Sequence, residues 1–482
     1  MAESGSESTS EPLHFAVVGG GVAGCAAASW AATRGVRVTI FNAGLPLGGT
    51  CIHIGTFPAR MLMSAATDHH RAAHPRFAGV DTGSSVPDWT RLNDTRRQMG
   101  QEIRDHFQRR LSRHPRVELV EQKASFVDET TLRAGDKTYE ADRILLTPGT
   151  HSMWPEVPGL DATEAIGIGD LGDLDGLPDR VLFVDINDDA LAYAQLLSRF
   201  GVDVTILTEE RRLVGEGESD QIDDAVVELL TGEGVDIAVD VDVDGAGRGD
   251  DGCYLEGTVD GEAARWTTDV VVLVDHRRPR TQSLGLDVAD VDVDDNGLIV
   301  IDESLQTTNP AVFAAGDAIG RDQHAYAAAY DAILAARNAI SPSRTAGHNT
   351  AVPFAIYTDP QLAGVGWSEP RARDAGFLAD TAIYSLERLP AARAMGCERG
   401  FVKLVRDRRS DHLVGARVMA PNASELVMEL ALTVRYGLTV SDLAAVVHPP
   451  ISMGEAIGEA ARRFTRKRPK TGAPPPSRPG AG

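Results

Sequence analysis

Cysteine is scarce in this chain of 482 residues, which contains only Cys25, Cys51, Cys253 and Cys397. No two of them have the spacing of a metal-binding or redox-active cysteine pair. The scarcity excludes a disulfide-stapled secreted fold and favours a reducing compartment. We therefore predict a cytoplasmic protein, and we expect no bound metal.

Net positive charge and uninterrupted apolar segments are also missing. Lys and Arg total 47 against 70 Asp and Glu, a net charge of −23, whereas nucleic-acid binding needs a positive face. Residues 15–33 are uncharged, but four glycines interrupt them and no basic segment precedes them, so they indicate neither a signal sequence nor a membrane span. We predict no nucleic-acid and no membrane partner. Residues 1–12 and the basic residues 466–482 are predicted to be disordered.

A strand–turn–helix–strand pattern occurs twice in the chain. Residues 13–42 combine an apolar run, a glycine cluster, an Ala-rich segment and a β-branched run, and residues 180–207 repeat the order. Such a βαβ duplication predicts an α/β protein with two Rossmann-like three-layer domains. From about residue 350 a further unit follows, with strands and helices of its own.

The first of these turns has the sequence Gly19-Gly20-Gly21-Val22-Ala23-Gly24 and matches G-x-G-x-x-G. It follows a predicted strand and opens a predicted helix. Glycines allow the backbone to approach a pyrophosphate, to which the helix N-terminus presents N–H groups and a partial positive charge. The pattern predicts a dinucleotide site; the alternative is a tight glycine turn without a ligand.

Further segments carry a resemblance to a known family. Residues 48–60 are GGTCIHIGTFPAR, residues 314–317 are AAGD and residues 358–360 are TDP. With the glycine turn, these segments make residues 13–465 similar to the flavoprotein disulfide reductases, the family of dihydrolipoamide dehydrogenase and mercuric reductase. The resemblance implies an FAD domain (13–150 and 276–345), an NAD(P)-like domain (151–275), a C-terminal α+β dimerisation domain (346–465) and a homodimer.

The same resemblance implies where FAD binds. Asn42 stands where the family has an acid that binds the adenosine ribose, and the loss of a charge-assisted hydrogen bond predicts looser binding. The implied FAD-binding residues are Gly19, Gly21, Val22, Ala23, Gly24, Asn42, Gly49, Thr50, Gly149, Gly316 and Asp317.

Two departures from the family predict that its usual activity is lost. The redox loop keeps Cys51, but its second cysteine position holds Thr56, and a disulfide cycle needs two sulfurs within bonding reach. The second glycine turn is replaced by residues 185–190, DINDDA, whose three aspartates disfavour a pyrophosphate. We therefore predict a degenerate NAD(P)H site and no NAD(P)H:disulfide reductase activity.

Two charge pairs of the family are altered as well. A Lys–Glu pair near the flavin becomes Arg60 and Ala192, which predicts that Arg60 is unpaired and either binds negative charge or turns to solvent or another carboxylate. The His–Glu pair that the partner subunit contributes is displaced. An alignment on Glu455 puts Pro450 at the His position, whereas an alignment on His448 leaves Glu455 two residues too far along.

The candidate catalytic residues are Cys51, His53 and Arg60, together with His448 and Glu455 of the partner subunit. Cys51, at the start of a predicted helix whose dipole favours a thiolate, is either a charge-transfer or covalent partner of the flavin, a nucleophile, or an inherited packed residue. His53 is either an acid or base near the flavin or a surface histidine.

These residues predict an FAD-dependent oxidoreductase that acts on a small organic substrate directly at the flavin. Its electrons would pass to oxygen or a protein partner, and a specialised biosynthetic pathway is one setting for such an enzyme. One alternative is a non-redox FAD-bound enzyme or scaffold with Cys51 as nucleophile. Another is residual NAD(P)H-dependent reduction of quinones or metals.

Overall fold

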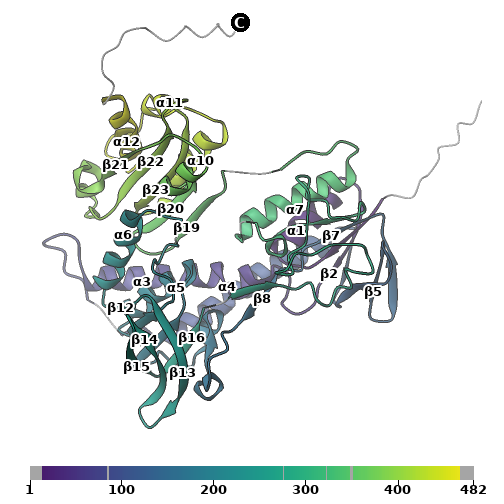
Figure 1. Ribbon diagram of the computed structural model, residues 1–482, viewed down its shortest axis with the longest axis horizontal. Coiled ribbons are helices and arrows are strands. Elements are labelled where there is room, and N and C mark those ends of the chain that lie inside the picture. Colours follow the sequence, from purple (N-terminus) through teal and green to yellow (C-terminus); the bar gives the residue numbers. More distant parts are fainter. Residues whose placement is uncertain are drawn as a thin grey trace, which may run out of the picture. The chain divides into compact units, whose positions relative to one another are not determined.

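A computed structural model describes residues 13–83, 86–215, 217–274, 276–321, 323–347 and 351–466 (Figure 1). Of the termini predicted to be disordered, residues 1–12 and 467–482 lie outside this part, whereas residue 466 is described. The chain forms two compact units. One contains the two βαβ segments and the other is built mainly from residues after 350.

The first βαβ segment belongs to a five-stranded parallel sheet. The sheet has the order β18 (Val312–Ala314), β7 (Arg143–Leu146), β1 (His14–Val18), β2 (Arg37–Phe41), β3 (Val117–Val120). The apolar run of β1 is wholly buried, as the central strand of a parallel sheet requires.

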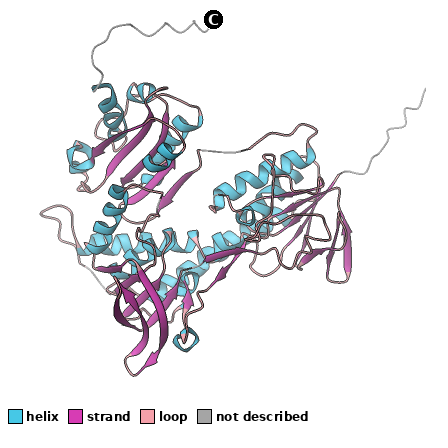
Figure 2. Ribbon diagram, in the orientation of Figure 1, coloured by secondary structure: helices cyan, strands magenta, loops and turns pink. Residues whose placement is uncertain are grey.

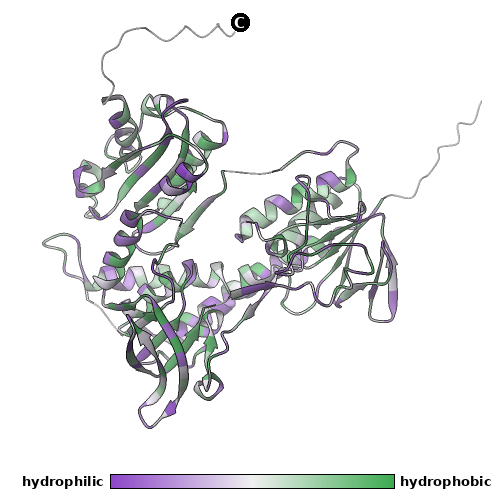
Figure 3. Ribbon diagram, viewed as in Figure 1, coloured by the Kyte–Doolittle hydropathy of each residue, from purple (hydrophilic) through white to green (hydrophobic). Residues whose placement is uncertain are grey.

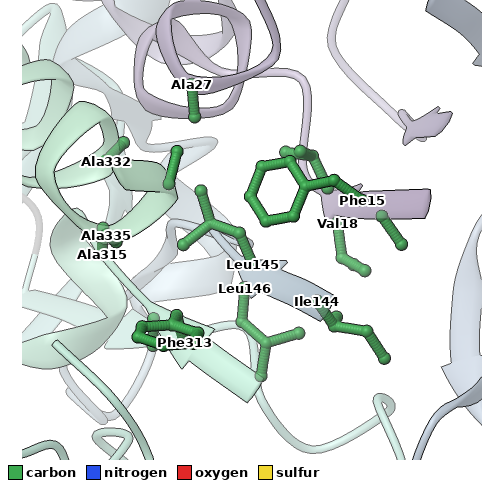
Figure 4. Packing of buried hydrophobic residues seen from close by; sticks show 14 of the residues in the cluster. Phe15, Val18, Ala27, Ile144, Leu145, Leu146, Phe313, Ala315, Ala332 and Ala335 are labelled. Carbon is green, nitrogen blue, oxygen red and sulfur yellow. The ribbon is translucent and has the colours of Figure 1, made fainter. Parts of the chain in front are cut away.

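Two alanine-rich helices cover this sheet. The helix α1 (Val22–Ala32) packs closely against α7 (Ala325–Ile340) because both present Ala side chains, and Figure 4 shows Ala27 of α1 and Ala332 of α7 over Phe15 and Leu145. The glycine turn between β1 and α1 therefore rests on a rigid core.

The second βαβ segment forms an equivalent parallel sheet. Its order is β12 (Val235–Ala238), β11 (Asp203–Leu207), β10 (Arg180–Val184), β16 (Val270–Leu273), β9 (Ile166–Gly167). The helix α5 (Asp188–Arg199) follows β10, and the inner strands are markedly hydrophobic (Figure 3). The predicted duplication is thus present in three dimensions.

Three helices lie between the strands β2 and β3 of the first sheet: α2 (Gly49–His53), α3 (Thr56–Ala73) and α4 (Trp89–Ser112). Antiparallel ribbons complete this unit. They comprise β4 (Ala124–Phe126), β5 (Thr131–Ala134) and β6 (Lys137–Glu140), then β13 (Val241–Gly249), β14 (Gly252–Val259) and β15 (Glu262–Thr268), and finally the pair β8 (Thr150–Met153) and β17 (His276–Pro279).

The second unit is an antiparallel sheet with helices (Figure 2). The strands are β19 (Pro353–Ile356), β20 (Gln361–Gly366), β23 (Leu413–Ala420), β22 (Phe401–Asp407) and β21 (Ala379–Ser385), in that order. The helix α10 (Ala423–Arg435) packs on β20 and β23, and α12 (Glu455–Arg466) packs on β21.

The predicted fold class is confirmed by two parallel α/β sheets and a C-terminal α+β unit. The domain boundaries given above stay a prediction. Within the described residues, no helix is long and apolar enough to cross a membrane.

Candidate functional site

The turn between β1 and α1 needs glycine at two positions for internal packing. A Cβ at Gly19 would lie 2.0 Å from the carbonyl oxygen of Thr147, and Gly19 has φ +116°. A Cβ at Gly24 would lie 1.9 Å from the carbonyl oxygen of Gly19. These two glycines bring strand and helix together and do not by themselves indicate a ligand.

Gly21 has a different role in the same turn. It is the N-cap of α1 with an ordinary φ of −67°, and a Cβ there would have no atom within 4 Å. No side chain caps α1 and its first turn holds no acidic residue. The first N–H groups of a helix have no partner within the helix, and together with the open space beside Gly21 they form a cradle that fits the pyrophosphate of FAD.

A cavity of about 350 Å³ lies at the end of β2, where the adenosine of FAD is expected. Asn42 lines it and donates a hydrogen bond from Nδ2 to the carbonyl oxygen of Leu45 (3.0 Å). Gln101, Arg104 and Glu121 line it as well. The volume suits a nucleoside-sized group, and the polar lining provides hydrogen-bond partners for a ribose.

Asp317 is held by residues far away in sequence. Its carboxylate accepts a hydrogen bond from Oγ1 of Thr150 (3.4 Å) and lies 3.7 Å from the Arg277 guanidinium. Gly149 is the residue before Thr150, and Gly316 is the N-cap of the short 3₁₀ helix that begins at Asp317. Arg277 and Thr150 were not predicted as site residues, although the Arg-x-Pro sequence at 277–279 was a usable signal.

The Cys51 loop is attached directly to the glycine turn. The backbone N–H of Gly48 donates to the carbonyl oxygen of Gly20 (2.8 Å), and a Cβ at Gly49 would lie 3.0 Å from the Cα of Gly21. Thr50 and Cys51 follow at once, in α2. The predicted proximity of Cys51 to the dinucleotide cradle thus has a structural basis.

The expected helix-dipole activation of Cys51 has little support. The helix α2 has only five residues, Gly49–His53, and Cys51 is the third. A macrodipole needs several aligned turns, so its stabilisation of a thiolate here is small. The side chain of Thr56, at the second cysteine position, lies outside the described part of the chain.

His53 and Arg60 both have contacts within the protein. Nε2 of His53 lies 3.2 Å from the carbonyl oxygen of Leu47. A carbonyl only accepts, so Nε2 donates and Nδ1 keeps a lone pair in the neutral ring. Arg60 is not the unpaired cation that was expected, because the structure gives it an interaction.

Thiol reactivity provides a test of how exposed each of the four cysteines is. Cys25 is buried, and burial raises the pKa of its thiol to about 11, so at pH 8 only about 0.1% is thiolate. Cys253 is buried too, whereas Cys51 and Cys397 are half-buried. We expect iodoacetamide at pH 8 to alkylate Cys51 and Cys397 first, measured by peptide mass spectrometry. Early labelling of Cys25 would contradict this assignment.

The second nucleotide turn, after β10, is closed by its own side chains. Asp185 has φ +73°, a conformation that favours glycine, and its Oδ1 accepts from the N–H of Ile186 (2.7 Å). Oδ1 of Asn187 accepts from the N–H of Ala190 (2.8 Å) and caps α5. The Asn187 cap occupies an N–H group at the start of α5 that would otherwise be open to a phosphate. That the NAD(P)H site is degenerate stays a prediction.

Asp188, the first residue of α5, is exposed to solvent. The predicted repulsion of a pyrophosphate by Asp185, Asp188 and Asp189 stays a prediction.

The helices α3 and α5 pack together (Figure 1), with Nη1 of Arg199 3.2 Å from Oγ1 of Thr67 and the His69 and Phe200 rings 5.7 Å apart. The C-terminal end of the helix that follows the second turn thus packs on the helix that follows the Cys51 loop.

His448 and Glu455 do not pair in the structure. Nε2 of His448 lies 3.1 Å from Oε2 of Glu429 on α10, a residue that no sequence motif indicated. Glu455 begins α12 and accepts from the backbone N–H of Ser452 (3.2 Å). Neither of the two sequence alignments predicted this arrangement.

Comparison with protein families gives two matches. The pyridine nucleotide-disulphide oxidoreductase family matches residues 13–332, and the dimerisation domain of pyridine nucleotide-disulphide oxidoreductases matches residues 352–461. The second match supports a homodimer.

Individual relatives agree with these matches. The chain is 31% identical over 471 residues to a mercuric reductase of Acidithiobacillus ferrooxidans, covering 96% of this chain and 85% of the relative. It is 29% identical over 456 residues to a dihydrolipoyl dehydrogenase of Geobacillus stearothermophilus, covering 92% and 94%. The HOCl-induced flavoprotein disulfide reductase RclA from Escherichia coli shares the fold, with a TM-score of 0.83, 23% identity and coverage of 93% and 99%. The cradle at Gly21, the adjoining Cys51 loop and these matches place the chain in the pyridine nucleotide-disulphide oxidoreductase family, as an FAD-dependent oxidoreductase.

Proposed function

We propose that this enzyme oxidises a small organic substrate directly at the flavin and is not an NAD(P)H:disulfide reductase. One observation carries the proposal: the first nucleotide turn has an open cradle with Cys51 beside it, whereas Asn187 closes the second turn. A reductase of the usual kind needs both turns open and two thiols.

The chain's own residues supply what such an oxidation requires. FAD, when bound, supplies a two-electron acceptor that oxygen or a protein partner can reoxidise. A substrate that gives up a hydride also releases a proton. We assign His53 as the base that accepts that proton. Its Nε2 donates to the carbonyl oxygen of Leu47, which leaves Nδ1 as the atom that can accept.

Cys51 and Arg60 are assigned to the same side of the site. Cys51 follows the Gly48–Gly49 segment that contacts the glycine turn, and we propose that its sulfur contacts the substrate or the flavin ring. Arg60 lies in the first turns of α3, and we assign it to negative charge on an acidic substrate or on the flavin. Substrates with a carboxylate are therefore the first to be tested.

Anaerobic absorbance spectroscopy tests the proposal. Excess NADPH is expected to leave the flavin band unchanged over minutes, because Asn187 and the aspartates around it disfavour the pyrophosphate. A carboxylate-containing substrate is expected to bleach the band. Rapid bleaching by NADPH would instead favour a residual NAD(P)H-dependent quinone or metal reductase, and a flavin that no organic substrate reduces would refute direct oxidation.

A further inference from the structure

The helix α2, which carries Cys51, contacts two segments that lie far from it in sequence. One is α4, where a Cβ at Gly100 would lie 4.0 Å from the carbonyl oxygen of Ile52. The other is the 3₁₀ helix η2 (Ile168–Asp173), which directly follows β9, an edge strand of the second sheet. These two contacts limit where α2, and with it Cys51, can lie.

Gly169 of η2 meets the residue that ends α2. A Cβ at Gly169 would lie 2.0 Å from Cγ2 of Ile54 and 3.8 Å from its carbonyl oxygen. Ile54 is the C-cap of α2, and its N–H donates to the carbonyl oxygen of Thr50 (2.9 Å). The φ of Gly169 lies outside the left-handed region, so glycine is needed here for space and not for backbone conformation. Any side chain at position 169 would therefore displace Ile54 or η2.

A buried arginine of α4 holds η2 in place. Nη2 of Arg96 donates to the carbonyl oxygen of Gly172 (2.9 Å) and to Oδ1 of Asp173 (2.6 Å). A Cβ at Gly172 would lie 2.7 Å from Cζ of Arg96, so this glycine makes room for the guanidinium. Nε1 of Trp89, also on α4, donates to the carbonyl oxygen of Leu174 just after η2 (3.1 Å). These bonds fix the C-terminal part of η2 to α4.

The orientation of the Arg96 guanidinium has an energetic cost. Its Nε donates to Oδ1 of Asn93 (3.1 Å), which fixes the end of the amide that faces the arginine. Asn93 is 1% exposed, and its Nδ2 has no hydrogen-bond partner among the residues that the structure describes. An unpaired buried amide nitrogen lowers stability and asks for an explanation, and the orientation of Arg96 provides one.

We propose that η2 is a positioning element for Cys51, with Arg96 and Gly169 as its positioning residues. Arg96 fixes η2 to α4, and Gly169 lets η2 pack directly against Ile54, so that α2 keeps one position beside the glycine turn. Because η2 follows β9, the second sheet takes part in the Cys51 site whether or not it binds NAD(P)H. The chemical role of Cys51 rests on the proposed function, whereas its positioning can be measured without turnover.

The first test is the rate at which iodoacetamide alkylates Cys51 in the FAD-loaded protein, measured by peptide mass spectrometry. Gly169→Ala is expected to raise this rate at least about fivefold, because α2 loses its packing against η2 and opens more often. Cys25 and Cys253, which are buried in the same unit, should react as slowly as in the wild type. Gly176→Ala is the matched control, since a Cβ there would have no atom within 4 Å.

Two outcomes of this test would overturn the proposal. One is an unchanged alkylation rate of Cys51 in Gly169→Ala. The other is faster alkylation of Cys25, Cys51 and Cys253 together, because a general loss of stability exposes every buried thiol and not only the one that η2 positions.

A second-site change tests the contact with Ile54. Ile54→Leu removes the methyl group Cγ2 from the Cβ and keeps the volume of the side chain. Combined with Gly169→Ala, it should return the Cys51 alkylation rate to within about twofold of the wild type. Absence of this rescue would refute positioning through Ile54.

Arg96→Met tests η2 from the side of α4. The variant keeps a long side chain but removes the donors to Gly172 and Asp173, so it too should raise the Cys51 alkylation rate. Arg96→Lys can keep the ion pair with Asp173 but not the other bonds of the guanidinium, and we expect a smaller rise. Equal rates in the wild type and Arg96→Met would refute the role of Arg96.

Stopped-flow flavin reduction separates this proposal from the proposed function. With a substrate that bleaches the flavin, Gly169→Ala should lower the rate at saturating substrate more than it weakens substrate binding. If no organic substrate bleaches the wild-type flavin, the proposed function fails, and alkylation still decides the role of η2. A wild-type reduction rate together with faster alkylation of Cys51 would contradict the chemical role of Cys51 and support its positioning by η2.

Discussion

Gly21→Ala is expected to give a folded protein that has lost most of its affinity for FAD. A Cβ at Gly21 meets no protein atom within 4 Å, so the fold has room for it. The same space is the cradle in front of the first N–H groups of α1, where a methyl group would keep a pyrophosphate from the backbone. We expect the FAD dissociation constant to rise at least about 100-fold, or about 2.7 kcal/mol.

Gly24→Ala, in the same turn, is expected to disturb the packing of β1 against α1 and thus to lower the stability of the protein. Its Cβ would lie 1.9 Å from the carbonyl oxygen of Gly19, so β1 and α1 would have to move apart. We expect the apoprotein to lose about 3 kcal/mol of unfolding free energy. Gly176→Ala is the neutral control, since that exposed glycine has an ordinary φ and nothing within 4 Å.

Fluorescence titration with FAD and thermal denaturation of the apoproteins measure the two effects independently. Gly21→Ala should bind weakly at an unchanged melting temperature, and Gly24→Ala should melt earlier. Wild-type affinity in Gly21→Ala would mean that the cofactor does not occupy this cradle.

Cys51→Ala is expected to slow substrate-dependent flavin reduction by about 10²- to 10⁴-fold, the range for loss of an acid, base or nucleophile at a reacting centre. The substitution removes one sulfur from a half-buried site next to the glycine turn. Stopped-flow absorbance with the substrate that bleaches the flavin measures the rate.

Cys397→Ala is the matched control, because this cysteine is also half-buried but belongs to the other compact unit. It should leave the rate unchanged. Replacement of FAD by a deazaflavin that oxygen does not reoxidise then separates the two roles of Cys51. Multiple turnovers with deazaflavin that are lost in Cys51→Ala would establish the non-redox alternative. An unaffected rate in Cys51→Ala with FAD would show that Cys51 is an inherited residue with a packing role only.

The two βαβ segments and the glycine turn of the first one could be predicted from local sequence patterns. The glycine spacing at 19–24 predicted the turn after β1, and the second apolar–Ala–apolar segment predicted β10, α5 and β11. These features succeed because strand and helix periodicity and glycine conformational freedom act over a few residues. The loss of the second redox cysteine at position 56 needed no structure either.

Contacts across the chain were beyond such patterns. Arg277 and Thr150 reach Asp317 only because β8 and β17 pair beside the first sheet. The carboxylate that meets His448 comes from Glu429, 19 residues earlier, and not from the nearer Glu455. The expected helix dipole at Cys51 has little support for a related reason, since the exact length of α2 does not follow from residue type.

The sequence by itself thus determined the family, the duplicated α/β architecture, the glycine turn after β1 and the missing second thiol, because each depends on short-range pattern. Only the tertiary structure decided that Gly21 and Gly24 differ in their packing, that Asn187 caps α5, and that Glu429 meets His448. Those outcomes depend on strand register and helix packing, which bring together side chains that are distant in the chain and fix which of several equally plausible partners lies within hydrogen-bonding distance.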